Sequence, residues 1–371
     1  MRIESLSVTN FRNLAQVECT PHPRFNLVVG DNGQGKTNLL EVIYLLGVLK
    51  SFRTDKNRQL LGPEGSKAIL GADIDRGGQL RHVGLEIQSR GKSVSLNHQL
   101  VRNLKDFFGT LNIVKFGPED VSLLKDSPSE RRRFLDRAIF QAHPIYAFEA
   151  SRYEEVLKQR NAILKSPASD LQLFEVYDAQ LVDTGSKLVA RRLEFLSFFE
   201  EVFVETFRSI FQNDLIPEIR YESSWKNDDA SSVAEIEDCL QRCLMRRREE
   251  EFSRGFTLSG PHRDDMVLYL NGHRAKDYAS QGQHRALVLS LKIAQIKYLQ
   301  SRYFFEPILL LDDVSSELDS LRNEQLFSFL LEETSGQVFV TSTHRDYIRL
   351  STEFGLFQMR EGTLQRPLSN P

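Results

Sequence analysis

The sequence predicts an α/β protein of two lobes: a head with mixed parallel and antiparallel sheets, and a mostly helical arm inserted into it. Three observations predict this class. A short apolar strand at residues 25–29 passes through a glycine-rich turn into a helix at residues 38–49. Apolar residues alternate with a period of two between residues 68 and 96, as in antiparallel strands. Residues 117–251 carry long stretches of helical periodicity.

The head is predicted to be discontinuous in sequence. Its first part is residues 1–116, its second part is residues 252–371, and the arm is residues 117–251. The second part contains two buried apolar runs, at residues 307–311 and 338–342, which fit central parallel strands. A single mixed sheet in the head would therefore join strands from both parts of the chain.

Local signals predict where several elements begin or turn. Ser127 to Glu130 combines a capping-box pattern with proline at the first helical position, which predicts a helix start. The longest helix is predicted from Asp178 to Phe211 on its apolar periodicity. Asn271-Gly272 predicts a hairpin turn.

Composition is that of soluble globular proteins, with 40% hydrophobic and 27% charged residues in a length of 371. No apolar run approaches the ~20 residues of a membrane span, so no membrane partner is expected. Three cysteines are too few for a disulfide framework, which predicts the reducing cytoplasm. Cys239 and Cys243 could share a helix face; without further Cys or a nearby His, packing is preferred over a zinc site.

Charge is unevenly distributed along the chain. Residues 1–116 hold 16 Lys and Arg against 10 Asp and Glu, whereas residues 117–251 hold 19 against 27. The basic hairpin turns at Arg76 and Arg90 are the first candidates for contact with DNA phosphates, and the arginine triplet at residues 131–133 is another. Ordinary solvated surface is the alternative interpretation for each of them.

The glycine-rich turn fits the pattern G-x-x-x-x-G-K-[ST] of a phosphate-binding P-loop. Its residues are Gly30, Asp31, Asn32, Gly33, Gln34, Gly35, Lys36 and Thr37. A strand, a glycine turn and a helix N-terminus direct backbone N–H groups at a phosphate. Lys36 would reach the β- and γ-phosphates of a bound nucleotide, and the Thr37 hydroxyl would ligate Mg²⁺. A chance match is the alternative, which the flanking strand and helix disfavour.

The strand at residues 307–311 ends in two carboxylates, which is the Walker B pattern. Asp312 would hold the Mg²⁺ ion through water, and Asp313 would orient or deprotonate the water that attacks the phosphate. The strand at residues 338–342 delivers His344 to its C-terminal edge, where ligands bind in α/β sheets. No chemical partner can be named for His262, and a structural role is the preferred interpretation.

The order of the motifs resembles that of an ABC-type ATPase head. After the P-loop come a Ser-x-Gly-Gln turn at residues 280–283, the Walker B strand, a Ser-x-Leu-Asp turn at residues 316–319 and a histidine. Residues 10–13 and 33–38 are similar to the branch that contains the SMC and RecF proteins. Over about residues 1–360 the chain resembles the RecF family of bacterial recombination mediators, through the stretches at residues 127–136, 159–161, 260–265 and 280–283.

The resemblance implies further site residues. Arg12, Asn13 and Asn38 would join the nucleotide site. The signature turn would contact the γ-phosphate bound to the other subunit of a dimer, through Ser280, Gln281, Gly282 and Gln283. Asp319 would line the dimer seam, and His344 would hold the γ-phosphate or the attacking water. In two respects the chain departs from the family pattern: Asp313 replaces the usual Glu, which suits slow hydrolysis, and the usual coupling Gln is not evident near residues 118–120.

The function implied by the resemblance is an ATP-switched DNA clamp in recombinational repair and replication restart. ATP with Mg²⁺ would join two copies on duplex DNA near single-strand gaps and junctions. A weak, DNA-stimulated ATPase activity would release them, and RecO and RecR would be partners in loading RecA. A transporter-type motor subunit would leave the antiparallel strands unexplained. A small-molecule P-loop kinase would leave the signature turn and His344 without a role.

Overall fold

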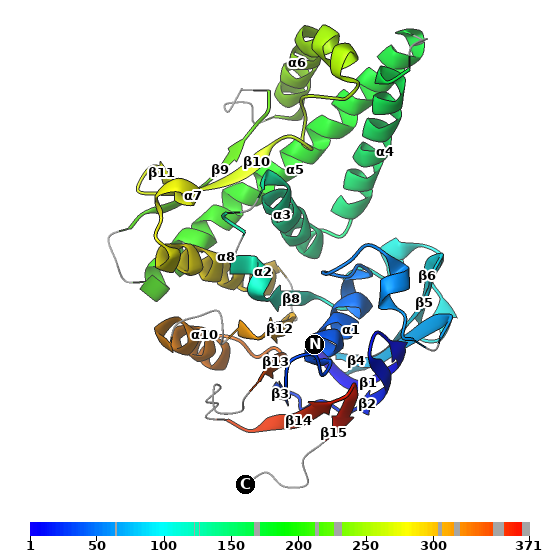
Figure 1. The fold of residues 1–371 in the computed structure, drawn as a ribbon. Helices are drawn as coiled ribbons and strands as arrows, with labels where there is room; N and C mark the ends of the chain where they lie inside the picture. The colour runs from blue at the N-terminus through cyan, green and yellow to red at the C-terminus, as the bar shows by residue number, and fades with distance from the viewer. Residues whose placement is uncertain are drawn as a thin grey trace. The chain divides into compact units, whose positions relative to one another are not determined.

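The computed structural model describes residues 1–63, 65–121, 123–125, 127–166, 171–211, 215–225, 232–302, 306–314, 320–343 and 352–365. The chain packs into two compact units, which Figure 1 shows as a ribbon. Unit 1 consists of Met1–Val121 and Gln295–Pro371, and unit 2 is Ser122–Ala294. In the described part of the chain, no helix is long and apolar enough to cross a membrane.

A six-stranded sheet in unit 1 contains both the strand before the P-loop and the Walker B strand (Figure 1). Its order is β15-β14-β3-β13-β12-β8, and every pair is parallel except β14–β15. The bounds are β3 Phe25–Val29, β8 Ile113–Phe116, β12 Ile308–Asp312, β13 Val338–Ser342, β14 Phe354–Arg360 and β15 Thr363–Gln365. Because β3, β12 and β13 run in one direction, the P-loop and Asp312 follow at the same edge of the sheet.

The second sheet of unit 1 is antiparallel throughout, in the order β2-β1-β4-β5-β6-β7. The bounds are β1 Arg2–Phe11, β2 Leu14–Cys19, β4 Lys67–Arg76, β5 Gln79–Gln88, β6 Gly91–Leu96 and β7 Gln99–Leu100. Ala68, Leu70, Ala72 and Ile74 form the buried face of β4. The predicted meander with a period of two is confirmed in β4, β5 and β6, and the two N-terminal strands belong to the same sheet because β1 pairs with β4.

The helix after the P-loop, α1 Lys36–Val48, packs between the two sheets of unit 1 (Figure 1). Its apolar side chains join one core with residues of β1, β4, β5, β8 and β12. Most of α1 is buried, including the carboxylate of Glu41. On the sheet of β3, helix α10 Ser320–Glu332 is tied to Arg24, which donates to the Leu330 carbonyl at 2.8 Å. Short helices α2 Pro118–Val121, η1 Asn57–Leu60 and η2 Leu104–Asp106 complete the described elements of this unit.

Unit 2 is built around the longest helix, α5, which packs against α4 and α6. The bounds are α3 Pro128–Ala142, α4 Tyr146–Leu164, α5 Leu171–Phe211, α6 Val233–Arg254, α7 Ala275–Tyr278 and α8 Gln281–Arg302, of which residues 295–302 belong to unit 1. α5 therefore starts seven residues before the predicted Asp178. A three-stranded antiparallel sheet, β11-β10-β9, packs on α3 and α5. Its strands are β9 Pro217–Glu222, β10 Asp265–Leu270 and β11 His273–Arg274.

The two units differ from the predicted lobes in residues 117–121 and 252–294. The second segment packs in unit 2 because β10 pairs with β9 from Asp265–Glu222 to Leu270–Pro217. The Asn271-Gly272 hairpin turn follows β10 as predicted, with φ of 52° and 77°. Residues 117–121 instead remain with unit 1, where α2 follows directly on β8.

Helix starts show the limits of capping patterns. Ser127 precedes α3 and Pro128 is its first residue, as predicted, but the Ser127 side chain makes no cap bond. Its hydroxyl lies 2.5 Å from the Ser129 hydroxyl instead. A complete capping box forms at Ser232 and Glu235, at the start of α6, where none was predicted.

The two cysteines four residues apart lie on the buried side of α6. Cys243 donates to the Ser259 hydroxyl at 3.3 Å, and both thiols are free of disulfides. Among the described residues, no group of three or more His, Cys, Asp or Glu side chains is arranged to hold a metal ion. Both thiols are buried in the packing of unit 2.

Candidate functional site

The backbone of the P-loop requires glycine at particular positions. Gly35, immediately before α1, has a φ of 116°, in the region that favours glycine. A Cβ atom on Gly30 would lie 2.4 Å from the Met359 carbonyl oxygen of β14. The first and last glycines of the sequence pattern are thus explained by a close approach and by a backbone conformation.

Lys36 is held inside the loop that precedes it. Its ammonium group donates to the carbonyl of Gly30 at 2.6 Å and to that of Asp31 at 2.9 Å. Burial lowers the pKa of Lys36, and the nearby carboxylates of Asp313 and Asp312 oppose that shift. The loop therefore holds one buried ammonium group at the edge of the sheet where Asp312 and Asp313 also lie.

Two strands and one helix bring hydroxyl and carboxylate groups together beside the P-loop. Thr37 donates through Oγ1 to Oδ1 of Asp312 at 2.9 Å, and Asp312 is buried at the end of β12. Thr341 of β13, paired with Asp312 in the parallel register, donates to the same oxygen at 2.9 Å. Asp313 follows with a φ of 48°, and its backbone N–H donates to Thr341 Oγ1 at 3.0 Å.

Asn13 and Asn38 hold the P-loop from outside. The Asn13 amide donates to the carbonyls of Gly33 at 3.3 Å and Gln34 at 3.1 Å. Asn38 donates to the Asn13 side-chain oxygen at 2.7 Å, and Arg53 donates to Asn38 at 2.8 Å. Arg53 was not predicted, because it belongs to an irregular connection with no motif.

Arg12 is paired with the P-loop helix. Its guanidinium donates to both carboxylate oxygens of Glu41, at 2.6 and 2.8 Å, and Glu41 is fully buried. Glu41 was missed by the sequence interpretation, although a signal exists: one carboxylate stands among the apolar residues of α1. A buried charge of this kind requires a partner.

The β14–β15 turn contacts the P-loop from the far end of the sequence. Glu361 donates its backbone N–H to the Gln34 side-chain oxygen at 2.5 Å, and Gly362 donates to the Gln34 carbonyl at 2.9 Å. A Cβ atom on Gly362 would lie 1.9 Å from the Asn13 carbonyl oxygen. This turn, also missed, braces both the P-loop and the β1–β2 turn.

We expect Gly362→Ala to lower the free energy of unfolding by about 1–3 kcal/mol and to weaken ATP binding about tenfold. The alanine must adopt a φ near 73° and displace Asn13, which carries the loop carbonyl contacts. Urea unfolding and titration with a fluorescent ATP analogue measure both effects. The control is Gly91→Ala, whose Cβ meets nothing within 4 Å. Unchanged stability and affinity in Gly362→Ala would show that the turn is not a brace.

The signature turn lies in unit 2, at the start of α8. Ser280 and Gln283 form a capping box: the Gln283 N–H donates to Ser280 Oγ at 3.2 Å, and the Ser280 N–H donates to Gln283 Oε1 at 2.8 Å. Ser280 and Gln281 are exposed, and Gly282 is half-buried. As an acceptor in this box, the Ser280 hydroxyl still has its own proton to donate.

The predicted site residues are thus only partly brought together. Unit 1 assembles Arg12, Asn13, residues 30–38, Asp312 and Asp313, whereas residues 280–283 belong to unit 2. Asp319 and His344 lie outside the described residues.

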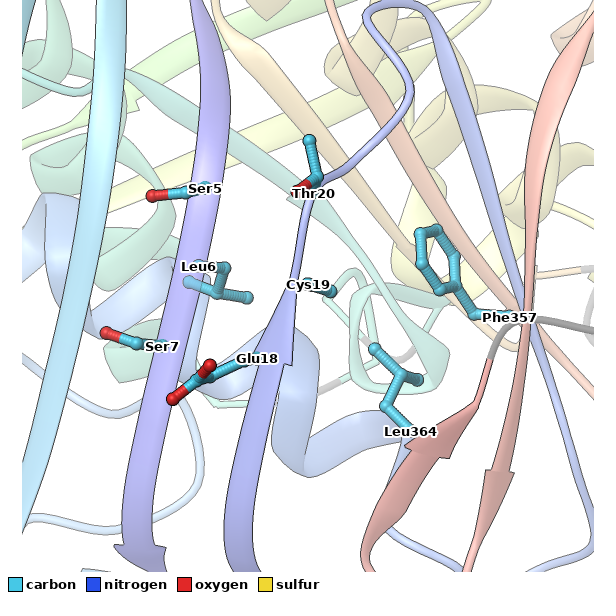
Figure 2. Close-up of a pocket in the computed structure, with 8 residues that line it drawn as sticks. All are labelled: Ser5, Leu6, Ser7, Glu18, Cys19, Thr20, Phe357 and Leu364. Carbon is cyan, nitrogen blue, oxygen red and sulfur yellow. The ribbon is translucent and has the colours of Figure 1, made fainter.

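A hollow of about 440 Å³ lies elsewhere in unit 1, between β1–β2 and the β14–β15 hairpin (Figure 2). The residues that line it are Ser5, Leu6, Ser7, Glu18, Cys19, Thr20, Phe357 and Leu364. None of the predicted nucleotide-binding residues is among them. The hollow is therefore a separate surface feature.

The basic residues proposed to contact DNA are mostly engaged within their own units. Arg131 is buried and donates to both carboxylate oxygens of Asp265, at 2.9 and 2.7 Å, while Arg132 donates to the Asp264 carbonyl at 2.7 Å. Arg76 donates to the Gly109 carbonyl at 3.1 Å. In the triplet only Arg133 is exposed, so the triplet serves chiefly to join α3 to β10.

His262 has the partner that the sequence did not reveal. Its Nδ1 lies 2.6 Å from the Tyr153 hydroxyl, and its Nε2 lies 3.2 Å from the Thr257 carbonyl oxygen. Because a carbonyl only accepts, Nε2 carries the proton and Nδ1 accepts from Tyr153. Burial lowers the pKa of His262 to about 4, so the imidazole is neutral and structural.

We expect this burial to make unit 2 less stable in acid. The unfolded imidazole binds a proton near its ordinary pKa of 6.5, and the folded one only near 4. The His262 contribution is therefore complete above pH 6.5 and is lost, by about 2–3 kcal/mol, as pH falls to 4. His262→Gln should therefore lose less unfolding free energy than the wild type as pH falls from 6.5 to 4.

The difference in pH dependence between the wild type and His262→Gln isolates the contribution of the His262 side chain. Burial raises the pKa of Asp264 and Glu251, whose protonation stabilises the folded state on acidification and so opposes the histidine effect. Urea midpoints between pH 4 and 8 measure the slopes, with His273→Gln, at an exposed position, as the control. Equal slopes for wild type and His262→Gln would contradict the assignment.

Comparisons with known proteins match nearly the whole chain and agree with one another. A family model described as "RecF/RecN/SMC N terminal domain" matches residues 2–365. The "DNA replication and repair protein RecF" of Geotalea uraniireducens (strain Rf4) is 37% identical over 353 residues, covering 94% of this chain and 95% of the relative. The protein of that description from Bacillus subtilis (strain 168) is 37% identical over 372 residues, covering 98% and 100%.

Solved structures agree with the sequence comparisons. "Structure of the recombination mediator protein RecF-ATPrS in RecFOR pathway" superposes with a TM-score of 0.91 at 28% identity, covering 99% of this chain and 98% of that one. An Smc head bound to a domain of ScpA has a TM-score of 0.56 at 15% identity, which shows a shared fold. The predicted ABC-type ATPase head fold is confirmed. The chain belongs to the RecF family of DNA replication and repair proteins, within the RecF/RecN/SMC group.

Proposed function

We propose that the chain is an ATP-dependent DNA clamp whose nucleotide site lies at the P-loop. The observation that carries this proposal is the pairing of Thr37 and Asp312, 2.9 Å apart, beside the buried ammonium group of Lys36. Hydroxyl and carboxylate oxygens suit Mg²⁺, which typically takes one or two protein oxygens and completes its shell with phosphates and water. When bound, Mg²⁺ would neutralise charge that develops on the phosphates.

Each residue of the site has a proposed role. Lys36 exchanges its two carbonyl partners for the β- and γ-phosphates of ATP, which the backbone N–H groups at the start of α1 also bind. Asp313 orients the attacking water, and its side chain, one methylene shorter than Glu, makes hydrolysis slow. Asn13 and Asn38 keep the loop in place, and Arg12 fixes α1 through Glu41.

The clamp needs two copies of the chain. The signature turn at the start of α8 donates the Ser280 hydroxyl proton and backbone N–H groups to the γ-phosphate bound by the other copy. Asp319 lines that seam, and His344 holds the γ-phosphate or the attacking water. In this proposal unit 1 is the ATPase head and unit 2 is the arm, although the boundaries of the two units differ from the predicted ones.

DNA binding follows from dimerisation. The surplus of Lys and Arg in residues 1–116 favours contact with duplex phosphates, and such contact weakens steeply with salt. Among the hairpin residues, Arg90 is exposed, whereas Lys92 donates to the Leu49 carbonyl at 2.8 Å. Gaps and single-strand junctions are the proposed targets, with RecO, RecR and RecA as partners.

Light scattering of the wild type and of Asp313→Asn tests the proposal. ATP with Mg²⁺ should double the molar mass, and gapped duplex DNA should join only that dimer. Asp313→Asn retains the shape of the side chain but loses the carboxylate, so its dimer should persist while the wild-type dimer decays as ATP is consumed. A monomer under every condition, or DNA binding that is indifferent to ATP, would refute the clamp.

A further inference from the structure

Thr341 is a buried residue of β13 whose hydroxyl contacts both acidic residues after the Walker B strand. It is fully buried in the sheet of unit 1. Oγ1 lies 2.9 Å from Asp312 Oδ1 and 3.0 Å from the Asp313 nitrogen. No sequence motif points to this residue, because Thr is ordinary in a buried strand.

The Thr341 hydroxyl has one proton, and the distances to its two possible acceptors show which of them receives it. The Leu311 carbonyl is 3.5 Å away, whereas the Asp312 carboxylate is 2.9 Å away and carries charge. The proton therefore goes to Asp312, and a lone pair of the same oxygen accepts the Asp313 N–H. Together with Thr37, Thr341 places a second hydroxyl on Oδ1 of Asp312, which fixes the carboxylate in orientation.

The second contact acts on the backbone. Asp313 has a φ of 48°, a left-handed conformation that is costly for a residue with a Cβ. The hydrogen bond from its N–H to Thr341 holds the chain in this turn as it leaves β12. The direction of the Asp313 side chain depends on that turn, and so on the Thr341 hydroxyl.

We propose that Thr341 is a positioning residue of the ATPase site, an inference that rests on the proposed nucleotide site. It acts through Asp312 and Asp313 and does not itself contact the nucleotide. Threonine suits the role because its branched side chain is stiff at χ1 and packs like valine in a strand. Valine would fill the same space, but it would remove the hydroxyl that accepts from the Asp313 N–H and donates to Asp312 Oδ1.

The test compares Thr341→Val with Thr341→Ser, which retains the hydroxyl. We expect Thr341→Val to lower kcat by about 10–100-fold, the range for removal of a group that orients a metal ligand. ATP affinity without Mg²⁺ should stay within about twofold, but the gain in affinity that Mg²⁺ confers should shrink by about tenfold. Thr341→Ser should recover both properties to within about threefold of wild type.

Thr334→Val is the matched control. Thr334 is also buried in unit 1 and lies just after the end of α10. Its hydroxyl donates at 3.0 Å to the carbonyl of Leu330, in the last turn of that helix. This variant loses one buried hydroxyl bond but leaves Asp312 and Asp313 untouched, so kcat and the Mg²⁺ gain should equal those of wild type. Melting curves confirm folding. If Thr341→Val does not fold, Thr341→Cys, with a weak donor, takes its place with the same expectation.

Two results would overturn the inference. One is a folded Thr341→Val protein with wild-type kcat and wild-type Mg²⁺ gain. The other is equal impairment of Thr341→Val and Thr341→Ser, which would assign the effect to packing rather than to the hydroxyl. Failure of the proposed function would look different, because then the wild type itself would show no ATP binding or no gain with Mg²⁺.

Discussion

Lys36→Met should reduce ATP affinity about 10²–10⁴-fold while leaving the chain folded. Lysine donates charge-assisted hydrogen bonds to the phosphates, each worth about 1.5–3 kcal/mol, and methionine of similar length donates none. Loss of two such bonds corresponds to about 3–6 kcal/mol, and each 1.4 kcal/mol is a tenfold change in Kd. In the structure, the same ammonium group donates to the carbonyls of Gly30 and Asp31.

Calorimetric titration with ATP and Mg²⁺ measures this effect. The control is Lys56→Met, which removes an exposed ammonium group from unit 1 outside the P-loop. Urea unfolding checks that Lys36→Met retains its structure, since the two loop carbonyls lose their lysine donor. A folded Lys36→Met protein with wild-type ATP affinity would mean that the P-loop does not bind the nucleotide.

Ser280→Arg should retain ATP binding and lose ATP-induced dimerisation, hydrolysis and ATP-dependent DNA binding. Ser280 is exposed at the start of α8, in a different unit from the P-loop. Arginine cannot reproduce the capping bond that Ser280 accepts from Gln283, and its bulk occupies the space that a γ-phosphate must approach. A helix start with Ser and Gly is an anion site, and the P-loop already supplies phosphate donors within one copy.

A mixture of Ser280→Arg with Lys36→Met tests whether the signature acts in trans. Each mixed dimer has one site with both parts intact and one site with both parts damaged. Partial hydrolysis should therefore reappear in the mixture although each variant alone is inactive. Ser151→Arg, at an exposed position of α4, controls for added charge in unit 2. An inactive mixture, or normal dimerisation of Ser280→Arg alone, would rule out action across the seam.

The elements of the site could be predicted because their signals are local. The strand before the P-loop, the helix after it and the strand ending in Asp312 each follow from a short apolar pattern beside glycine or carboxylate. The braces of the loop could not be predicted. Gln34 and Glu361 are 327 residues apart, and no periodicity encodes such a contact.

Partners that no sequence pattern marks explain other differences. Ser127 and Ser280 both precede a Glu or Gln by three residues, yet only Ser280 forms the capping box, because the Ser127 hydroxyl pairs with Ser129. The arginines at 131 and 132 looked like exposed charge because their partners, Asp265 and the Asp264 carbonyl, lie more than 130 residues later. Residues 252–294 were predicted to belong to the head but pack in unit 2. The cause is again a distant partner, because β10 pairs with β9.

The position of β3 between β13 and β14 has a consequence for synthesis on the ribosome. β3 is translated before both of its neighbours in the sheet, which begin at or after residue 338. A nascent chain therefore carries an unpaired apolar strand until β13 and β14 have been made, and such strands aggregate unless they are shielded. Stalled chains of graded length should acquire ATP binding only after β14 has left the exit tunnel, and earlier binding would contradict this order. Prematurely released fragments would thus be unable to compete with full-length copies for nucleotide.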